Sequence, residues 1–421
     1  MAAGTDGGTH KAQKAGYDGI DLGVTMKKRN FITALILVGV IAFAVWVTIN
    51  GGLPSTGTPA TTRQSTTRQA TTTAAPPPSE VKLMAVGDNL IHKPLIEQAR
   101  ARAGGNGYDF TYCYDGVRSL IARADLAVIN QESILAGDIA EPSSYPMFCT
   151  PTQCGDAIYD LGFRAICTSN NHVLDKGTRG VLASLDYWAT KPGIVTFGSY
   201  RNEDDFNTPR VLDVSGITFA FTAATFSYNG LQLPRDSELV LPLVEDEDRL
   251  RRAIEAGKQA ADVMVVALHW GNEDSQTVTE HQRALARRLA DWGADIILGH
   301  HPHVLQTMEF LEREDGSRAF VIYSLGNFLS GQAQAPNLIG GVIELTVTKD
   351  GGAIAVDTPR FHPVITHYGS GFSNVRLIAW PDYTPALAAA HGVSRYDSRF
   401  GYAYIENLLR RTIPEEYLVM D

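Results

Sequence analysis

Three histidines stand within four residues of this chain. His300, His301 and His303 follow the apolar segment 295–298, which has the composition of a buried strand. Neutral imidazole is the commonest protein ligand for divalent transition metals. Burying three imidazoles is costly unless a cation or hydrogen-bond partners satisfy them. The sequence therefore predicts a metal site here, with His301 and His303 on one face of the extended segment.

Four other apolar segments also end in side chains that bind metals or transfer protons. They span residues 81–86, 126–130, 165–167 and 263–268. Because ligands collect at the carboxyl ends of strands in α/β sheets, we expect these side chains to converge. The residues expected to join the histidines are Asp88, Glu132, Asn171, His172, Asp175 and His269.

Each of these residue types suits a metal-dependent reaction. The carboxylates of Asp88 and Glu132 can hold or bridge divalent cations, and the amide oxygen of Asn171 is a further candidate ligand. His172 could donate a proton to a leaving group, and Asp175 could orient its imidazole. For a single carboxylate the alternative stays open, because an acid after a strand is often a turn or helix cap.

Several neighbouring polar residues carry a weaker signal. His92 lies in the loop after the first strand and could be near the cluster without taking part. Trp270 and Glu273 are interpreted as supports rather than ligands. His300 would point away from its two neighbours on a regular strand, although a turn could change that. Asn327 either hydrogen-bonds across the site or belongs to a plain turn.

Charge and hydropathy narrow the class of protein. A net charge of −10 over 421 residues, with no basic stripe, argues against general nucleic-acid binding. The stretch 31–49 is apolar and free of charge for 19 residues, long enough to span a bilayer. Basic residues 27–29 precede it, so the positive-inside rule predicts a cytoplasmic N-terminus. A cleaved signal peptide is the rival, with a shorter apolar core than this one.

These features divide the chain into five predicted parts. Residues 1–28 form a cytoplasmic tail and residues 29–50 a transmembrane helix. The Thr- and Pro-rich linker 51–80 cannot offset its ordering entropy, so we expect a disordered stalk. A folded domain at 81–368 and a C-terminal extension at 369–421 would lie outside a bacterial cell membrane.

The outer domain alternates strand-like and helix-like segments, which is typical of a layered α/β fold. Thr279 and Gln282 form a capping box, and Gly293 supplies a helix stop. Beyond residue 365 the periodicity is weak and predicts no element. Helices are expected at 115–124, 153–162, 245–260 and 279–292, and hairpins at 305–311 with 319–323 and at 341–348 with 353–358.

The four cysteines lie in the predicted outer domain, where disulfides can persist. Residues 150–153 are typical of a helix start with a capping box. Cys149 and Cys154 then occupy the two positions of a hydrophobic staple, which predicts a disulfide between them. Cys113 and Cys167 remain, either as a second disulfide or as two buried free thiols.

Six ordered motifs resemble the bacterial capsule-synthesis CapA family, which is associated with poly-γ-glutamate biosynthesis and related to calcineurin-like metallophosphoesterases. The resemblance covers residues 81–365. It implies a four-layer α/β/β/α sandwich with the ligand and proton-donor roles given above. The motifs are Gly87-Asp88, Asn130-Gln131-Glu132, Asn170-Asn171-His172 with Asp175, His269-Trp270-Gly271, Gly299-His300-His301-Pro302-His303 and Ser324-Leu325-Gly326-Asn327-Phe328.

The chain departs from the metallophosphoesterase pattern at the first two motifs. Leu90 stands where those enzymes have the histidine of Asp-x-His, so His92 or His300 could replace that ligand. Glu132 stands in place of a bridging aspartate. These departures argue against ordinary phosphodiesterase activity and leave metal binding expected.

The clustered ligands, the resemblance and the apolar segment together favour a membrane-anchored extracellular hydrolase or transferase. It would use divalent metal ions, expected to be two in number and to be Mn, Zn or Fe. Its partners would be an anionic envelope polymer or precursor, the membrane and membrane-bound polymer synthase components. The alternative is a non-catalytic assembly or export factor for an anionic capsule polymer. A third reading is a surface binding module on a stalk.

Overall fold

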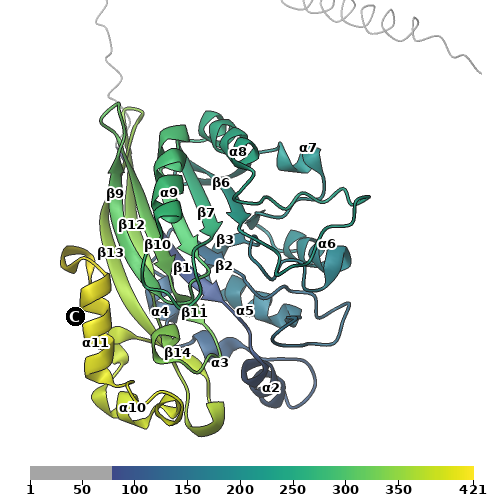
Figure 1. Ribbon diagram of the computed structural model, residues 1–421, viewed down its shortest axis with the longest axis vertical. Helices are drawn as coiled ribbons and strands as arrows, with labels where there is room; N and C mark the ends of the chain where they lie inside the picture. The colour runs from purple at the N-terminus through teal and green to yellow at the C-terminus, as the bar shows by residue number, and fades with distance from the viewer. Residues whose placement is uncertain (1–77) are drawn as a thin grey trace, which may run out of the picture. The chain divides into compact units, whose positions relative to one another are not determined.

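The structure of the chain is a computed structural model that describes residues 78–421 (Figure 1). The predicted tail, the predicted transmembrane helix and residues 51–77 of the predicted linker lie outside the described residues. Within 78–421, no helix combines the length and the apolar character that crossing a bilayer requires.

Two mixed β-sheets form the centre of the described domain. The larger has eight strands in the order β14-β13-β12-β1-β2-β3-β4, with β11 beside β1. Strands β1 to β4 are parallel, whereas β12, β13 and β14 are antiparallel additions. Its strands are β1 (Ser79–Asn89), β2 (Leu126–Asn130), β3 (Phe163–Cys167), β4 (Val195–Phe197), β11 (Asn327–Leu329), β12 (Ile339–Asp350), β13 (Ala353–His367) and β14 (Arg376–Ala379).

The second sheet has six strands in the order β5-β6-β7-β8-β10-β9. Its inner strands β6, β7, β8 and β10 are parallel, and the edge strands β5 and β9 are antiparallel. The strands are β5 (Arg210–Val214), β6 (Ile217–Thr225), β7 (Val263–His269), β8 (Ile296–His300), β9 (Leu305–Glu312) and β10 (Arg318–Leu325).

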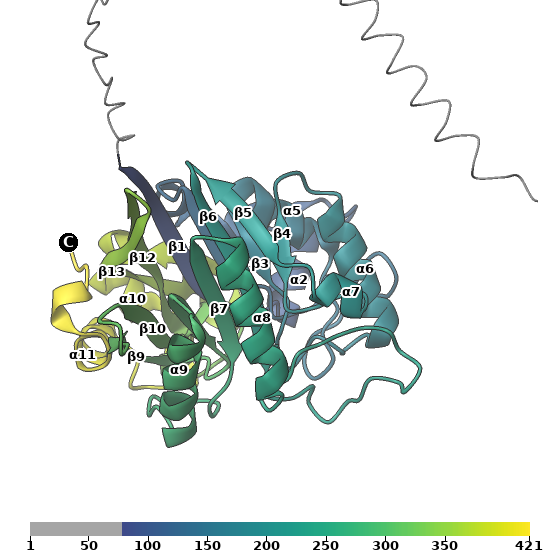
Figure 2. The same ribbon diagram turned by 90° about the horizontal axis from the view of Figure 1, so that it is seen from above.

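Alternate residues of the six-stranded sheet enter two different cores. Phe219 and Val265 belong to the core shared with the eight-stranded sheet. Met264 and Ile297 instead pack with helices α8 and α9, which cover the other face (Figure 2). The α/β expectation is confirmed as a mixed α/β fold with two mixed sheets. The helices are α2 (Lys93–Arg102), α3 (Thr111–Tyr114), α4 (Arg118–Ile121), α5 (Thr152–Leu161), α6 (Gly177–Ala189), α7 (Glu203–Phe206), α8 (Glu247–Ala260), α9 (Glu280–Trp292), α10 (Pro385–Ala390) and α11 (Tyr402–Thr412).

The strongest local signals are confirmed. Helix α9 begins at Glu280, directly after Thr279, whose side chain forms the capping box with Gln282. The helix ends before Gly293, whose φ is 114°. Both predicted hairpins form, as β9 with β10 and as β12 with β13. Strand β13 is longer than predicted, since it continues to His367 and pairs with β14.

The prediction of a helix over 115–124 is wrong, because the helix in this segment is shorter. The segment carries only the short helix α4, and Gly116 forms an isolated bridge with Ile378 of β14. A Cβ at Gly116 would lie 2.2 Å from the carbonyl oxygen of Leu377. Contact with a distant strand therefore replaces the local helix at this position.

The predicted Cys149–Cys154 disulfide is absent, because all four cysteines are buried free thiols. Helix α5 starts at Thr152, and Pro151 is its extended N-cap with ψ 140°. Thr150 instead bridges Leu135. This shift moves Cys149 out of the staple position, and Cys149 and Cys154 lie in different hydrophobic clusters.

The segment beyond residue 365, for which the sequence predicts no element, contains β14, α10 and α11. Strand β14 extends the larger sheet. Helix α11 reaches the loop that follows β7, where Gln276 accepts a 2.8 Å hydrogen bond from Arg411 and donates one of 3.2 Å to Thr412. The C-terminal segment thus supports a loop next to the candidate site.

Candidate metal centre

Strand β1 delivers Asp88 to the junction of the two sheets. Gly87 allows this approach, since a Cβ there would lie 1.8 Å from the carbonyl oxygen of Gly326. The same oxygen accepts a hydrogen bond from the Asp88 amide at 3.0 Å. The glycine before Asp88 is therefore required by close packing of the β1 end on the loop after β10.

The Asp88 carboxylate is fully buried and contacts both sheets. Its Oδ1 accepts a 2.7 Å hydrogen bond from Asn130 and lies 3.2 Å from Nδ1 of His300. Its Oδ2 accepts from the amide of His301 at 3.2 Å and lies 3.3 Å from Nδ1 of His303. Residues separated by most of the domain's sequence thus meet at one carboxylate.

Glu132, from the loop after β2, lies beside the same group. Its Oε2 is 3.8 Å from Nδ1 of His303, and its Oε1 is 3.5 Å from Nε2 of His269. Glu132 is fully buried, and neither carboxylate oxygen has a hydrogen-bond partner among the described residues. Both oxygens of this central carboxylate are therefore available to bind a cation.

A second group of predicted ligands surrounds His269, the last residue of β7. Its Nε2 lies 3.0 Å from Oδ1 of Asn171. The His269 and His301 rings have centroids 4.8 Å apart, and Phe226 packs against His301 at 4.3 Å. The amide oxygen and two imidazoles therefore share one buried space next to Glu132.

The backbone after β8 turns sharply to bring its histidines together. His301 and His303 have φ values of 95° and 59°, a left-handed conformation that is uncommon outside glycine and is often retained at functional sites. His300, His301 and His303 are 2%, 3% and 4% exposed. His300, the last residue of β8, points to Asp88 rather than away from the cluster.

Asn327, the first residue of β11, orients His303. Its Nδ2 donates to the carbonyl oxygen of Asn337 at 3.0 Å, which leaves its Oδ1 facing Nδ1 of His303 at 3.0 Å. Of the two interpretations of Asn327, the structure favours the hydrogen bond across the site.

His172 and Asp175 form the expected pair beside the ligand cluster. Nδ1 of His172 lies 2.8 Å from Oδ2 of Asp175, and this oxygen also accepts the amide of Phe148 at 2.6 Å. Because a carboxylate only accepts, Nδ1 carries the proton and Nε2 is left to take up or deliver one. Phe148 packs edge-on against the imidazole at 4.7 Å.

The two buried carboxylates differ in proton affinity. Burial alone raises the pKa of Asp88, but its close contacts with the imidazoles of His300 and His303 outweigh burial and hold this pKa well below its usual value. Burial raises the pKa of Glu132 well above its usual value, because it outweighs the opposing effect of His303, and the charge of Asp88 adds to the increase.

The buried histidines also differ in the direction in which their pKa values are shifted. Burial lowers the pKa of His269 well below its usual value and that of His301 to about 3, so both keep a lone pair at neutral pH. Burial also acts to lower the pKa of His303, yet the carboxylates of Glu132 and Asp88 raise it to about 10. Neutral imidazoles are the form that binds metals.

The unpartnered atoms test whether a cation fits this site. Buried polar atoms in proteins nearly always have partners, because leaving one unpaired costs free energy. Here the atoms without a hydrogen-bond partner among the described residues include both oxygens of Glu132 and the Nδ1 atoms of His269, His300 and His301. Oxygen and imidazole donors clustered in this way suit divalent metals.

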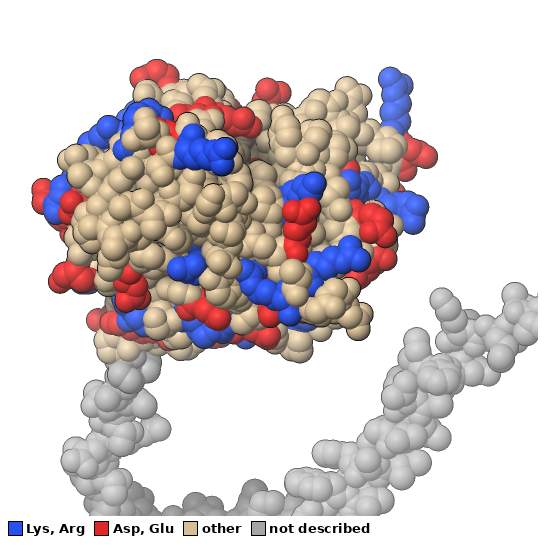
Figure 3. Space-filling model, turned by 90° about the horizontal axis from the view of Figure 1, so that it is seen from below, with Lys and Arg blue, Asp and Glu red and all other residues tan. Residues whose placement is uncertain are grey.

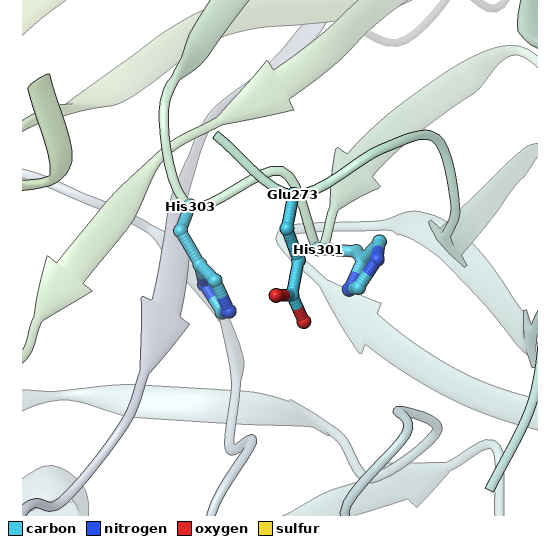
Figure 4. A group of neighbouring side chains, drawn as sticks. All are labelled: Glu273, His301 and His303. Carbon is cyan, nitrogen blue, oxygen red and sulfur yellow. The ribbon is translucent and has the colours of Figure 1, made fainter. Parts of the chain in front are cut away.

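In each of two sets of side chains, the ligand atoms lie within 4.8 Å of one another. The first set is Asp88, Glu132 and His303, and the second is Glu273, His301 and His303. Glu273 was interpreted from sequence as a support. Its carboxylate lies between the imidazoles of His301 and His303 (Figure 4). An acid in a loop after a strand is common, so its spacing from His269 gave no specific signal.

The other neighbours have different contacts. Nδ1 of His92 lies 3.1 Å from both the carbonyl oxygen of Leu90 and the amide of Gly331. The Trp270 indole donates to the carbonyl oxygen of Tyr323 at 2.9 Å and belongs to the core under α8 and α9. Neither residue joins the two sets of candidate ligands.

The sequence profile of the family described as "Bacterial capsule synthesis protein PGA_cap" matches residues 82–332, more than half of the chain. The chain belongs to this family. The matched segment contains every predicted ligand, His172, Asp175 and Glu273. Membership agrees with the CapA resemblance in the sequence.

Two curated relatives share a segment of similar length. The PGA biosynthesis protein CapA of Bacillus subtilis is 32% identical over 202 residues, 46% of this chain and 49% of that protein. The capsule biosynthesis protein CapA of Bacillus anthracis is 30% identical over 204 residues, 47% of each chain. The chain thus spans about half the length of these relatives.

Similarity to solved structures is weaker. A phosphatase from Mycoplasma pneumoniae aligns with 68% of this chain and 94% of its own, at 13% identity and a TM-score of 0.41. A likeness at this level carries no argument about fold or activity.

Proposed function

We propose that the chain is a metal-dependent hydrolase or transferase that acts on a cell-envelope polymer or precursor in capsule or poly-γ-glutamate biosynthesis. One observation carries the proposal: Glu132 is fully buried beside Asp88, its oxygens have no hydrogen-bond partner among the described residues, and it lies next to the imidazoles of His269 and His303 from the six-stranded sheet. The family to which the chain belongs supports the biological setting. We further propose a four-layer α/β/β/α architecture of the metallophosphoesterase type.

The candidate ligands are Asp88, Glu132, Asn171, His269, His301 and His303, which suit two divalent ions of Mn, Zn or Fe. When bound, such ions supply Lewis-acid activation of water and stabilise developing negative charge. The described face at the lower side of Figure 1 has no extended basic patch (Figure 3). An anionic substrate would therefore meet its positive charge mainly at the metal centre.

His172 is the proposed proton donor. Its Nδ1–H is held by Asp175, which fixes the tautomer and presents Nε2 as the atom that exchanges a proton. Phe148 excludes water from one side of the ring. Burial of the whole group strengthens each electrostatic interaction within it.

We also propose that residues 29–50 anchor the chain in the bacterial cell membrane, with the N-terminus cytoplasmic and the catalytic domain outside. The composition of this segment and the basic residues before it support this orientation. Its partners would then be an anionic polymer or precursor and membrane-bound synthase components. Protease added to intact cells should remove the domain, and full protection of the domain would contradict this orientation.

The activity is tested on purified full-length protein. Phosphodiester, phosphomonoester and γ-glutamyl substrates are incubated with Mn²⁺, Zn²⁺ or Fe²⁺, and again with a chelator. Turnover of one class that is lost on chelation supports the proposal. Metal binding without turnover of any class, combined with normal polymer output from a His172→Ala strain, would favour the assembly-factor alternative.

A further inference from the structure

The Glu273 carboxylate is the one member of the two candidate ligand sets that is exposed. It makes no hydrogen bond or ion pair with another residue in 78–421. An exposed acid by itself says little, since such groups are common on surfaces. Its position is more specific: one of its oxygens lies within 4.8 Å of ligand nitrogens of both His301 and His303.

His301 provides an independent observation at the same place. It is 3% exposed, and its Nδ1 is buried without a hydrogen-bond partner among the described residues. A buried imidazole nitrogen without a partner is a costly arrangement unless something else binds there. The carboxylate of Glu273, which is exposed, lies between this imidazole and that of His303 (Figure 4).

The loop that carries Glu273 is fixed to the histidine segment. The next residue, Asp274, donates its amide to the carbonyl oxygen of Pro302 at 2.9 Å, between the two histidines. Its carboxylate accepts from Asn337 at 2.6 Å and from Gln334 at 3.4 Å. The position of the Glu273 backbone is therefore set by the same turn that presents His301 and His303.

A second group of contacts holds the remainder of this loop. Gln306 at the start of β9 donates to the carbonyl oxygens of Ser275 at 2.8 Å and Thr277 at 3.2 Å. Gln276 is bound by Arg411 and Thr412 of α11. An exposed loop with this many tertiary hydrogen bonds presents its side chains in a defined orientation, which is what a preorganised ligand needs.

We infer that Glu273 is a metal ligand that completes a cation position with His301 and His303. His303 belongs to both candidate sets, and its Nδ1 faces Asp88 and Glu132 of the first set. The new members of the second set are therefore Glu273 and His301. The inference rests on the proposed metal-dependent function and adds one residue to its ligand set. It also assigns that residue to the solvent side, where a substrate would enter.

The test compares Glu273→Gln with wild type in the full-length protein. Gln keeps the size of the side chain and removes the charge. Glu314→Gln is the matched control, because Glu314 is also exposed and lies in the turn at the far end of β9. Mn²⁺ affinities are measured by competition with a chelator, and the visible absorption of bound Co²⁺ reports the ligand field.

The expected result is that Glu273→Gln weakens one Mn²⁺ site by about tenfold or more and alters the Co²⁺ spectrum, while a second site keeps its affinity. Glu314→Gln should match wild type. If Glu273→Gln binds Mn²⁺ and Co²⁺ as wild type does, the inference about Glu273 is overturned and the proposed function stands. If wild type binds neither metal, both are overturned.

Discussion

Oδ2 of Asp88 lies 3.3 Å from Nδ1 of His303, and this contact joins the two sheets at the candidate site. Asp88 stands near the end of β1, and His303 lies in the turn after β8. Both side chains are at least nine-tenths buried. The contact therefore depends on how the sheets pack. Changes in packing at the strand ends should alter the metal affinity of the candidate centre.

Gly87→Ala tests that dependence. The added Cβ would lie 1.8 Å from the carbonyl oxygen of Gly326, so β1 or the loop after β10 must move. We expect the free energy of unfolding to fall by about 3 kcal/mol or more, with loss of metal affinity. Chemical denaturation and metal titration measure the two effects.

Gly401→Ala is the control for Gly87→Ala. Gly401 has an extended φ of 178°, and a Cβ there would meet no atom within 4 Å. Its unfolding free energy should change by less than about 1 kcal/mol. If both variants lost the same unfolding free energy, the close contact of Gly87 with Gly326 would not be the cause of the destabilisation.

Metal should stabilise the folded protein through Glu132. Because the cation site exists only in the folded state, metal at a hundred times its dissociation constant adds about 2.7 kcal/mol to the free energy of unfolding. Glu132→Gln keeps the shape and removes the carboxylate, so this gain should be mostly lost. Thermal unfolding with and without Mn²⁺ is the measurement, and an undiminished gain in the variant would contradict the role assigned to Glu132.

The local parts of the fold were predictable because their signals are local. The Thr279–Gln282 capping box and the left-handed Gly293 define both ends of α9 within a few residues of sequence. At 150–153 an equally local signal failed, because Thr150 pairs with Leu135 and shifts the helix start. Local patterns therefore predicted structure only where no distant strand competed for the same residues.

The sequence predicted which residues belong to the candidate site, but it did not predict how their side chains are arranged. The strand-end rule selected Asp88 and His303 from separate apolar segments, and the structure brings them together. Sequence could not place His300 on Asp88, since that contact depends on how the end of β8 packs against the end of β1. Glu273 was underestimated because its position comes from the tertiary contacts of its loop.

Catalysis should depend on His172 more than metal binding does. His172→Ala removes the proposed proton donor and should lower kcat by about 10²- to 10⁴-fold on whichever substrate is turned over, with metal content unchanged. Asp175→Asn should lower kcat less and alter the pH profile, because it perturbs the tautomer through the 2.8 Å contact. Loss of bound metal in His172→Ala would instead make this residue a ligand.

Stability should rise with pH between about 4 and 6.5 because of buried neutral histidines. Burial lowers the pKa of His391 to about 4, and Nε2 of this residue contacts the carbonyl oxygen of Thr366 at 3.0 Å. In this window the unfolded chain binds a proton that the folded chain does not, so the folded state loses stability as pH falls from 6.5 towards 4.

His391→Asn should remove one such proton. The dependence of the unfolding free energy on pH should become shallower by about 1.4 kcal/mol per pH unit within the same window. Denaturant titrations at a series of pH values measure it. An unchanged slope would mean that His391 takes up its proton equally in the folded and unfolded states.

The most direct test of the metal centre is the metal content of purified full-length protein after loading with Mn²⁺ or Zn²⁺ and removal of free metal. We expect about two equivalents in wild type and a clear loss in the Asp88→Asn, Glu132→Gln double variant. Wild-type protein that is folded and retains only background metal would contradict it.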